Sequence, residues 1–345
     1  MNGARASAAP AAPGDAGRPH AIGGWLEAAA FVVAIGALSL VYAIGHTLGA
    51  HPIAFILYAM IASATATLAF AGPGSHASRI ILHPASWLIG IAIILIEIFY
   101  YQTLAYVAPA HGNLMVRAGV PLAMAFGWAA LGRRPPPLAI AGAIAILLAI
   151  AFLVAVTPPQ VRWPMAASGI LTGVFMVVRS YGGEFHPWNR AARTVREKLS
   201  VTGMLVLVTS IASLAATALA AAAIAAGLLP ESRIVPTAAQ MLHVPTIVLG
   251  SLAGGAILTL MMYLNFASVV KIGTENLTAV MAFSPLTVWA FQELGVLAGL
   301  IDARRPEPAV VAVMVVCIAA VLLIIRSGMR ARRLRGGVAI PSARR

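Results

Sequence analysis

The sequence is poor in charge and has almost no cysteine. Only 10% of its 345 residues are charged, ten of them Asp or Glu, and Cys317 is the single cysteine. A disulfide within the chain is therefore excluded. Because 61% of the residues are hydrophobic, the chain has more apolar surface than a soluble domain of this length can bury. The composition predicts a membrane protein.

The sequence also lacks the motifs of several functional classes. It has no Gly-x-x-x-x-Gly-Lys-Ser/Thr, so the chain is not itself a motor of the class that uses this nucleotide-binding loop. No ring of like charges or selectivity loop indicates a channel. His46, His51, His111 and His243 lack the spacing of metal ligands and are interpreted as solvated residues at one membrane face. We expect neither a metal nor a cofactor.

Long hydrophobic runs are what the sequence does have. A hydrocarbon core about 30 Å thick needs roughly 20 helical residues, and richness in Ala, Leu and Ile favours helices over a β-barrel. Ten such runs lie near residues 24–45, 51–72, 86–108, 111–131, 136–156, 164–182, 201–227, 243–265, 275–297 and 308–327. The predicted fold is all-α, with ten transmembrane helices.

The basic residues are divided unequally between alternate loops. With the amino terminus inside, 18 of the 23 Lys and Arg residues fall in cytoplasmic segments, Arg179 among them. Four fall outside, and Arg117 lies within the fourth run. This asymmetry predicts two cytoplasmic termini and a multi-pass protein of the cell inner (plasma) membrane. The basic residues form no single aromatic-rich surface, so no nucleic-acid partner is expected.

Two halves of the chain resemble each other. A shift of 163 residues sets Tyr100 on Tyr263 and Asn113-Leu114 on Asn276-Leu277, and "GRRPPP" from Gly132 has an echo in "ARRPEP" from Ala303. This pattern indicates an internal repeat. Each copy has five runs, and because five is odd, the second copy enters the membrane from the opposite side. The sequence therefore predicts inverted repeats, an arrangement typical of secondary transporters.

This repeat organises the whole chain. Residues 1–23 form a predicted disordered cytoplasmic tail, followed by the first repeat at 24–158 and the second at 159–327. The second repeat contains a basic cytoplasmic linker at 183–200, expected to contact anionic lipid of the inner leaflet. A basic cytoplasmic tail occupies 328–345.

The motifs of the first half resemble those of the drug/metabolite transporter superfamily, in its ten-helix EamA branch. The likeness is clearest over Ala105–Leu148, where Pro121 and Leu131-Gly132 match the family pattern and Arg133 replaces its usual Glu. The second half keeps Pro285 but not Leu-Gly-Glu. The resemblance implies a central cavity lined mainly by spans one, three, four, six, eight and nine. It also implies efflux of a small metabolite or drug, with protons as a candidate coupling ion.

Two prolines fall inside predicted spans. Pro121 lies in the fourth span and Pro285 in the ninth, and a proline within a helix removes a backbone hydrogen bond and kinks it. We interpret both as hinges, with a static kink as the open alternative.

Two ionisable residues fall where lipid would surround them, and intramembrane charge usually marks function. By helical rise, Glu97 lies roughly 18 Å and Arg117 roughly 11 Å below the turn that joins spans three and four. They are predicted to pair, either as a structural ion pair or as the polar floor of a substrate cavity. In the second case Glu97 is the candidate proton carrier.

Other polar and aromatic residues are candidates for substrate binding. Tyr100 and Tyr101 share a helix face with Glu97, a combination that suits cationic or aromatic solutes. The remaining candidates are Asn113, Tyr263, Asn265, Asn276, Trp289 and Gln292. For the two repeated asparagines, Asn113 and Asn276, helix capping is the alternative to binding.

We therefore predict a secondary active transporter that works by alternating access, as a monomer or homodimer, with a small-molecule substrate. An integral-membrane enzyme or lipid-handling scaffold is the alternative from another class, although no cluster of His, Asp or Ser supports it. A facilitative channel is a further alternative.

Overall fold

The computed structural model describes residues 18–230, 234–302 and 307–336, and most of these residues are helical, with no strand among them. Ten helices or helix series are long and apolar enough to cross a membrane, which confirms the predicted all-α class and span number. We number them spans 1 to 10. In order, they are α1 Arg18–Thr47, α2 Pro52–Ala71, α4 Pro84–Tyr106, α5–η1–α6 from Pro109 to Leu131, α7 Pro137–Val156, α8 Pro159–Phe185, α10 Val195–Ala225, α12–η2–α13 from Val244 to Ile272, α14–α15 from Thr274 to Leu297, and α16 Pro308–Gly336.

Short helices connect some of the spans. They are α3 Ala77–Leu82, α9 Pro187–Ala191 and α11 Ala238–Met241. The segment predicted as a linker, 183–200, is largely helical, because α8 continues to Phe185 and α10 begins at Val195. The side chain of Thr194 and that of Glu197 form a capping box that starts α10.

Three spans are interrupted. Span 4 consists of α5 Pro109–Met115, a 3₁₀ turn η1 Val116–Ala118 and α6 Gly119–Leu131. Span 9 consists of α14 Thr274–Met281 and α15 Ser284–Leu297, separated by a turn. Span 8 consists of α12 Val244–Leu249, a π-helical turn η2 Gly250–Gly254 and α13 Gly255–Ile272.

The breaks in spans 4 and 9 explain where the two prolines lie. Pro121 and Pro285 occupy the first turn of α6 and of α15, directly after each break. Their missing N–H groups would have no helical partner there in any case. Each span thus changes its helical hydrogen-bonding pattern at mid-length, directly before its proline, while the backbone around the interruption stays in the right-handed helical region.

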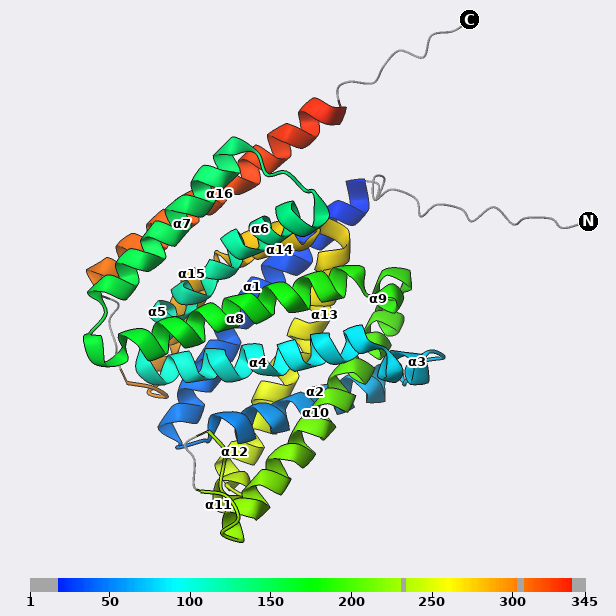
Figure 1. Ribbon diagram of the computed structural model, residues 1–345, viewed down its shortest axis with the longest axis vertical. Coiled ribbons are helices and arrows are strands. Elements are labelled where there is room, and N and C mark those ends of the chain that lie inside the picture. The colour runs from blue at the N-terminus through cyan, green and yellow to red at the C-terminus, as the bar shows by residue number, and fades with distance from the viewer. Residues whose placement is uncertain (1–17, 231–233, 303–306, 337–345) are drawn as a thin grey trace, which may run out of the picture.

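The spans pack in a consistent set of pairs. α4 packs on α8, α1 on α13, α2 on α10 and α7 on α16, while α15 packs on α1 and α6 packs on α8. Figure 1 shows α7 beside α16 along one edge and α2 beside α10 near the bottom, with α1, α4, α8 and α13 between them. α1 begins and α16 ends at the same end of the bundle, which we call the terminal end; the other is the opposite end.

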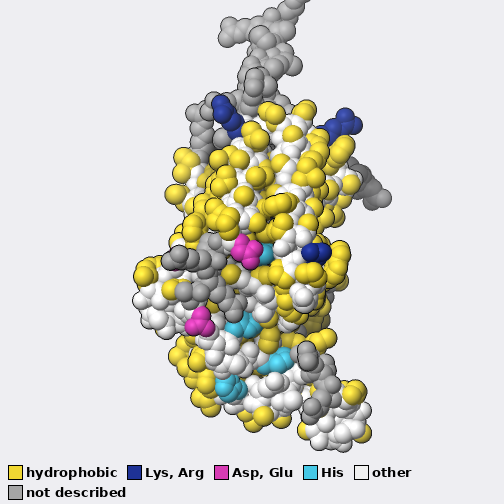
Figure 2. Space-filling model, turned by 90° about the vertical axis from the view of Figure 1, so that its left-hand side faces the viewer, with side chains coloured by type: hydrophobic (Ala, Val, Ile, Leu, Met, Phe, Trp, Pro, Cys, Tyr) yellow, Lys and Arg dark blue, Asp and Glu magenta, His cyan; other side chains and the backbone are white. Residues whose placement is uncertain are grey.

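Hydrophobic side chains cover most of the surface that Figure 2 presents, and charged side chains are few on it. Large apolar residues such as Leu148, Leu219 and Leu252 are at least 65% exposed. Such exposure is costly in water and favourable in hydrocarbon, as expected for helices that face lipid.

Glycines bring the broken spans into backbone contact with their neighbours. A Cβ atom on Gly173 of α8 would lie 2.9 Å from the Gly119 nitrogen and 3.1 Å from the Val116 carbonyl oxygen. At span 9, a Cβ atom on Gly36 of α1 would lie 2.8 Å from the Thr287 carbonyl oxygen of α15. Only glycine allows these approaches without displacing backbone.

Gly173→Ala is therefore expected to destabilise the protein, by about 1–3 kcal/mol as for other overpacked sites. The measurement is the melting temperature of the purified chain in detergent. Gly23→Ala is the matched control, because a Cβ atom there meets only the Lys271 Nζ at 3.9 Å. Equal melting temperatures for the two variants would contradict the packing at Gly173.

Candidate functional site

A small cavity with a mainly apolar surface and several polar residues in its lining lies at the centre of the bundle, between spans 1, 3, 4, 6 and 8. It has a volume of about 30 Å³. Its polar lining residues are Glu97, Tyr100, Asn113, Arg117, Thr172 and Arg179, and its apolar lining includes Phe31, Met176 and Met261. Three of these residues, Glu97, Arg117 and Arg179, have charged side chains within apolar helices. Burying a charge there costs free energy, so such residues usually have a function.

The carboxylate of Glu97 is held by span 1 and not by Arg117. The Tyr42 hydroxyl donates a hydrogen bond of 2.7 Å to Glu97 Oε2. No ion pair between Glu97 and Arg117 exists among the described residues, so the predicted partner of Glu97 is wrong. The helical-rise estimate located both residues at suitable depths but did not define the directions of their side chains.

Arg179 supplies the second positive charge of the cavity. This residue was counted with the cytoplasmic charges, but the structure places it inside α8, where it is 1% exposed. Its guanidinium carbon lies 5.6 Å from the centre of the Phe31 ring, a cation–π contact. The count of 18 cytoplasmic basic residues therefore includes one that is buried in the protein.

Arg117 joins the two helix breaks. It lies in η1, and its Nε donates to the Asn113 carbonyl at 3.1 Å while its Nη1 donates to the Met281 carbonyl. Met281 is the last residue of α14, so its carbonyl has no partner within that helix. A guanidinium group in the 3₁₀ turn of span 4 thus donates a hydrogen bond to the unpaired carbonyl at the break in span 9.

Asn113 is the centre of a hydrogen-bond chain across four spans. Its Nδ2 donates to the Tyr100 hydroxyl at 3.1 Å, and that hydroxyl lies 2.7 Å from the Ser39 hydroxyl. On its other side, the Ser284 hydroxyl donates to Asn113 Oδ1 at 2.5 Å. The side chain does not cap its helix. Asn113 therefore links spans 1, 3, 4 and 9 at the cavity.

A larger vestibule of about 190 Å³ lies at the opposite end of the bundle. It is formed by the ends of α1, α4 and α15 and the start of α5, with His46, Gln292 and Asp302 among its lining residues. α1 and α4 line both this vestibule and the central cavity. The two spaces therefore follow one another along the same pair of helices, separated by about one helical turn.

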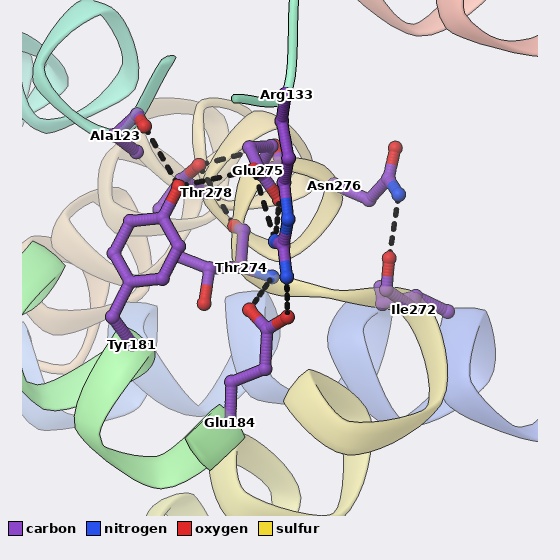
Figure 3. A network of polar contacts seen from close by, with 9 residues as sticks. All are labelled: Ala123, Arg133, Tyr181, Glu184, Ile272, Thr274, Glu275, Asn276 and Thr278. Atoms are coloured by element: carbon purple, nitrogen blue, oxygen red, sulfur yellow. Dashed lines mark hydrogen bonds and ion pairs between the residues drawn. The ribbon is translucent and has the colours of Figure 1, made fainter. Parts of the chain in front are cut away.

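At the terminal end, ion pairs close the bundle. Arg133, in the loop after α6, contacts Glu184 of α8 at 2.6 Å and Glu275 of α14 at 2.9 Å. The Tyr181 hydroxyl lies 3.0 Å from Glu275 Oε1 and 2.8 Å from the Ala123 carbonyl. Figure 3 shows the Arg133 side chain extended between the two carboxylates. We call these residues the terminal-end network.

The local sequence explains how Arg133 reaches this network. Gly132 ends α6 in a left-handed conformation, φ +65°, and the Arg133 N–H donates back to the Gly127 carbonyl. Partial burial alone would lower the pKa of Arg133, but hydrogen bonds to Glu184 and Glu275 outweigh it and raise the pKa above its usual value. The guanidinium group remains charged across the physiological range.

A second ion pair lies at the same end. Lys271, in the last turn of α13, pairs with Glu27 of α1, and both side chains are mostly buried. At the terminal end, ion pairs thus join spans 4, 6 and 9 to one another and, separately, span 1 to span 8. At the opposite end, spans 1, 4 and 9 surround the vestibule together with span 3.

The other predicted binding residues lie outside the central cavity lining. Tyr101 packs between α1 and α2, with its ring centre 5.0 Å from that of Tyr42. Asn276 Nδ2 donates to the Ile272 carbonyl, which ends α13, and Trp289 donates to Glu293. Gln292 lines the vestibule, and Tyr263 packs on the core.

Asn265 is a separate case. It is fully buried, and neither its side-chain nitrogen nor its side-chain oxygen has a hydrogen-bond partner among the described residues.

Sequence reasoning missed Arg179, Thr172 and Tyr42. Arg179 stands within the apolar run of span 6, and its position before the predicted end of that run was an available signal. The roles of Tyr42 and Thr172 had no such signal, because tyrosine and threonine are common in spans that only pack.

Within the described ranges, no group of three or more His, Cys, Asp or Glu residues is arranged to hold a metal ion. His51 and His111 are buried, with 9% and 8% of their surface exposed, so the interpretation of these two histidines as solvated residues is wrong.

Comparison with known proteins identifies the fold alone. No protein-family model matches the chain, and no curated protein matches its sequence. A solved structure, described only as the crystal structure of a protein, is similar with 17% sequence identity and a TM-score of 0.55. The similarity covers 88% of this chain and 97% of that chain.

Proposed function

We propose that this chain is a secondary transporter that moves a small organic solute across the inner membrane by alternating access of two inverted five-helix repeats. The observation that carries the proposal is the central cavity, a buried site lined by Glu97, Arg117 and Arg179. It includes the 3₁₀ turn of span 4, and Arg117 connects it to the break of span 9 through the Met281 carbonyl. Interrupted spans that meet at a midplane site are typical of secondary transporters.

The helix pairing supports the inverted repeats. Exchanging each span of the first half with its counterpart five spans later turns the pair α4–α8 into the pair α13–α1, and both pairs are in contact. The same exchange turns α1–α15 into α8–α6 and maps α2–α10 and α7–α16 onto themselves. A packing pattern unchanged by this exchange is what a pseudo-twofold axis between the halves requires.

The two ends of the bundle support alternating access. The terminal end is closed by ion pairs, while the opposite end has the vestibule. In this interpretation, the described conformation is open toward the opposite end of the bundle, where the vestibule lies. Breaking the terminal-end network then opens the site toward the terminal end. With the termini cytoplasmic, as the basic residues favour, the terminal end is the inner one. Efflux and proton coupling rest on the resemblance to drug/metabolite transporters.

Solute counterflow in proteoliposomes tests the proposal. An expressing strain is first screened for altered tolerance to amino acids, nucleosides, organic carboxylates and cationic drugs, and labelled solutes of each class are then assayed with the purified full chain. We expect saturable uptake and counterflow for at least one class. A channel would show neither, and an enzyme would alter its substrate. Unsaturable flux or chemical conversion of the solute would overturn the proposal.

A further inference from the structure

The central cavity contains more positive than negative charge. Arg117 and Arg179 both line it, and each is 1% exposed. Glu97 is the sole acidic residue among the described residues that line it. Two guanidinium groups against one carboxylate leave a surplus of one positive charge. An isolated buried charge is strongly unfavourable, so a counter-charge is required.

The same guanidinium groups have nitrogen atoms without acceptors. Nη2 of Arg117 and both Nε and Nη2 of Arg179 are buried and lack a hydrogen-bond partner in the described part of the chain. Leaving such groups unpaired costs about 1–3 kcal/mol each, more where they are charged. Arginine presents its N–H groups in a planar fork that fits a carboxylate, so the free positions match an anionic ligand.

We propose that the cavity binds the carboxylate of a monoanionic organic solute, held by Arg117 from span 4 and Arg179 from span 6. This inference names the substrate class of the transporter proposed above and rests on that proposal. One negative charge neutralises the surplus, whereas a phosphate dianion would reverse it. The site differs from the acid-and-aromatic face expected from sequence, which suited cations, because Arg179 adds a charge that was assigned elsewhere.

The apolar residues of the lining indicate which chemical group the rest of the solute has. Phe31, Met176 and Met261 make the cavity apolar beside the two arginines, which suits an aliphatic or aromatic group. Asn265 lies one helical turn from Met261 on the same face of α13, and both its amide atoms are unpartnered. A volume of about 30 Å³ admits the carboxylate alone, so the body enters space that opens when the halves move.

Matched triplets of small molecules test the charge preference directly. The probes are phenylacetate, phenylacetamide and phenethylamine, with butyrate, butyramide and butylamine as a second body. Binding is measured as the shift in melting temperature of the full chain in detergent. We expect each carboxylate to bind at least about tenfold more tightly than its amide and amine, and phenyl phosphate to bind more weakly than phenylacetate. A preference for any amide, amine or phosphate, or no preference in either triplet, would overturn the proposal.

Variants assign the preference to the two arginines. Arg179→Gln is expected to abolish the carboxylate preference and Arg179→Lys, which keeps the charge but loses the fork, to weaken it. Glu97→Gln raises the surplus charge and is expected to tighten carboxylate binding. Arg190→Gln, at an exposed position of α9, is the control and is expected to bind as the wild type does. Loss of the preference in Arg190→Gln or Glu97→Gln, or its retention in Arg179→Gln, would remove the arginines from this role.

Binding and transport fail separately in these experiments. Carboxylate-selective binding without counterflow would overturn the transporter and leave the anion site standing. Counterflow of neutral or cationic solutes, without carboxylate binding, would overturn the anion site and leave the transporter standing.

Discussion

Replacing Glu97 with glutamine is expected to reduce transport about tenfold or more and to flatten its dependence on pH between 5 and 8. Glu97 is 2% exposed and accepts the Tyr42 hydrogen bond at the cavity. Glutamine keeps the size and an acceptor oxygen but can neither be charged nor take up a proton. A hydrogen bond to a charged group contributes about 1.5–3 kcal/mol, and 1.4 kcal/mol corresponds to a factor of ten.

The measurement is the initial rate of solute uptake into proteoliposomes at each pH, for wild type and variant reconstituted at equal density. Glu197→Gln is a suitable control, because Glu197 is an exposed capping residue at the start of α10 and is not among the residues that line the cavity. A Glu97→Gln variant with the wild-type rate across this pH range would exclude Glu97 from coupling. A lower rate with an unchanged pH profile would limit it to holding the site.

Replacing Arg133 with alanine is expected to open the terminal end of the bundle. The variant leaves Glu184 and Glu275 facing each other without the cation that both contact. The side chains are 35%, 13% and 27% exposed in the order Arg133, Glu184 and Glu275, so the loss lies between the ~1 kcal/mol of a surface pair and the about 3 kcal/mol of a buried one. A change of that size is enough to invert a two-state equilibrium of comparable stability.

Spin labels measure this opening. Cysteines at Trp128 of α6 and Arg190 of α9, on a Cys317→Ser background, place one label on each side of the terminal-end network; both positions are exposed. We expect Arg133→Ala to shift the distance distribution to longer values. Arg134→Ala, an exposed neighbour that forms no ion pair in the described structure, is expected to leave it unchanged. An identical distribution in Arg133→Ala and wild type would contradict a gating role for the network.

The residue assignments show which inferences were accessible without coordinates. Glu97, Arg117, Tyr100 and Asn113 were identifiable because polar groups in apolar runs stand out one residue at a time. Their partners were not identifiable. Glu97 pairs with Tyr42, 55 positions away, and Arg117 with Met281, 164 positions away. Such pairings depend on how helices turn about their axes, which periodicity alone leaves undetermined.

The sequence by itself determined the class of the protein. Its hydrophobic runs are long enough to cross a bilayer, and in hydrocarbon such a run must form a helix, because only then do its backbone N–H and C=O groups all have hydrogen-bond partners. The tertiary structure alone decided the character of the site. It moved Arg179 from a surface count into the cavity, connected the two helix breaks through Arg117, and gathered Arg133, Glu184 and Glu275 at one end. The physical reason is that the composition of a helix determines whether lipid or water surrounds it. The balance of charge around a cavity depends instead on which faces of separate helices meet.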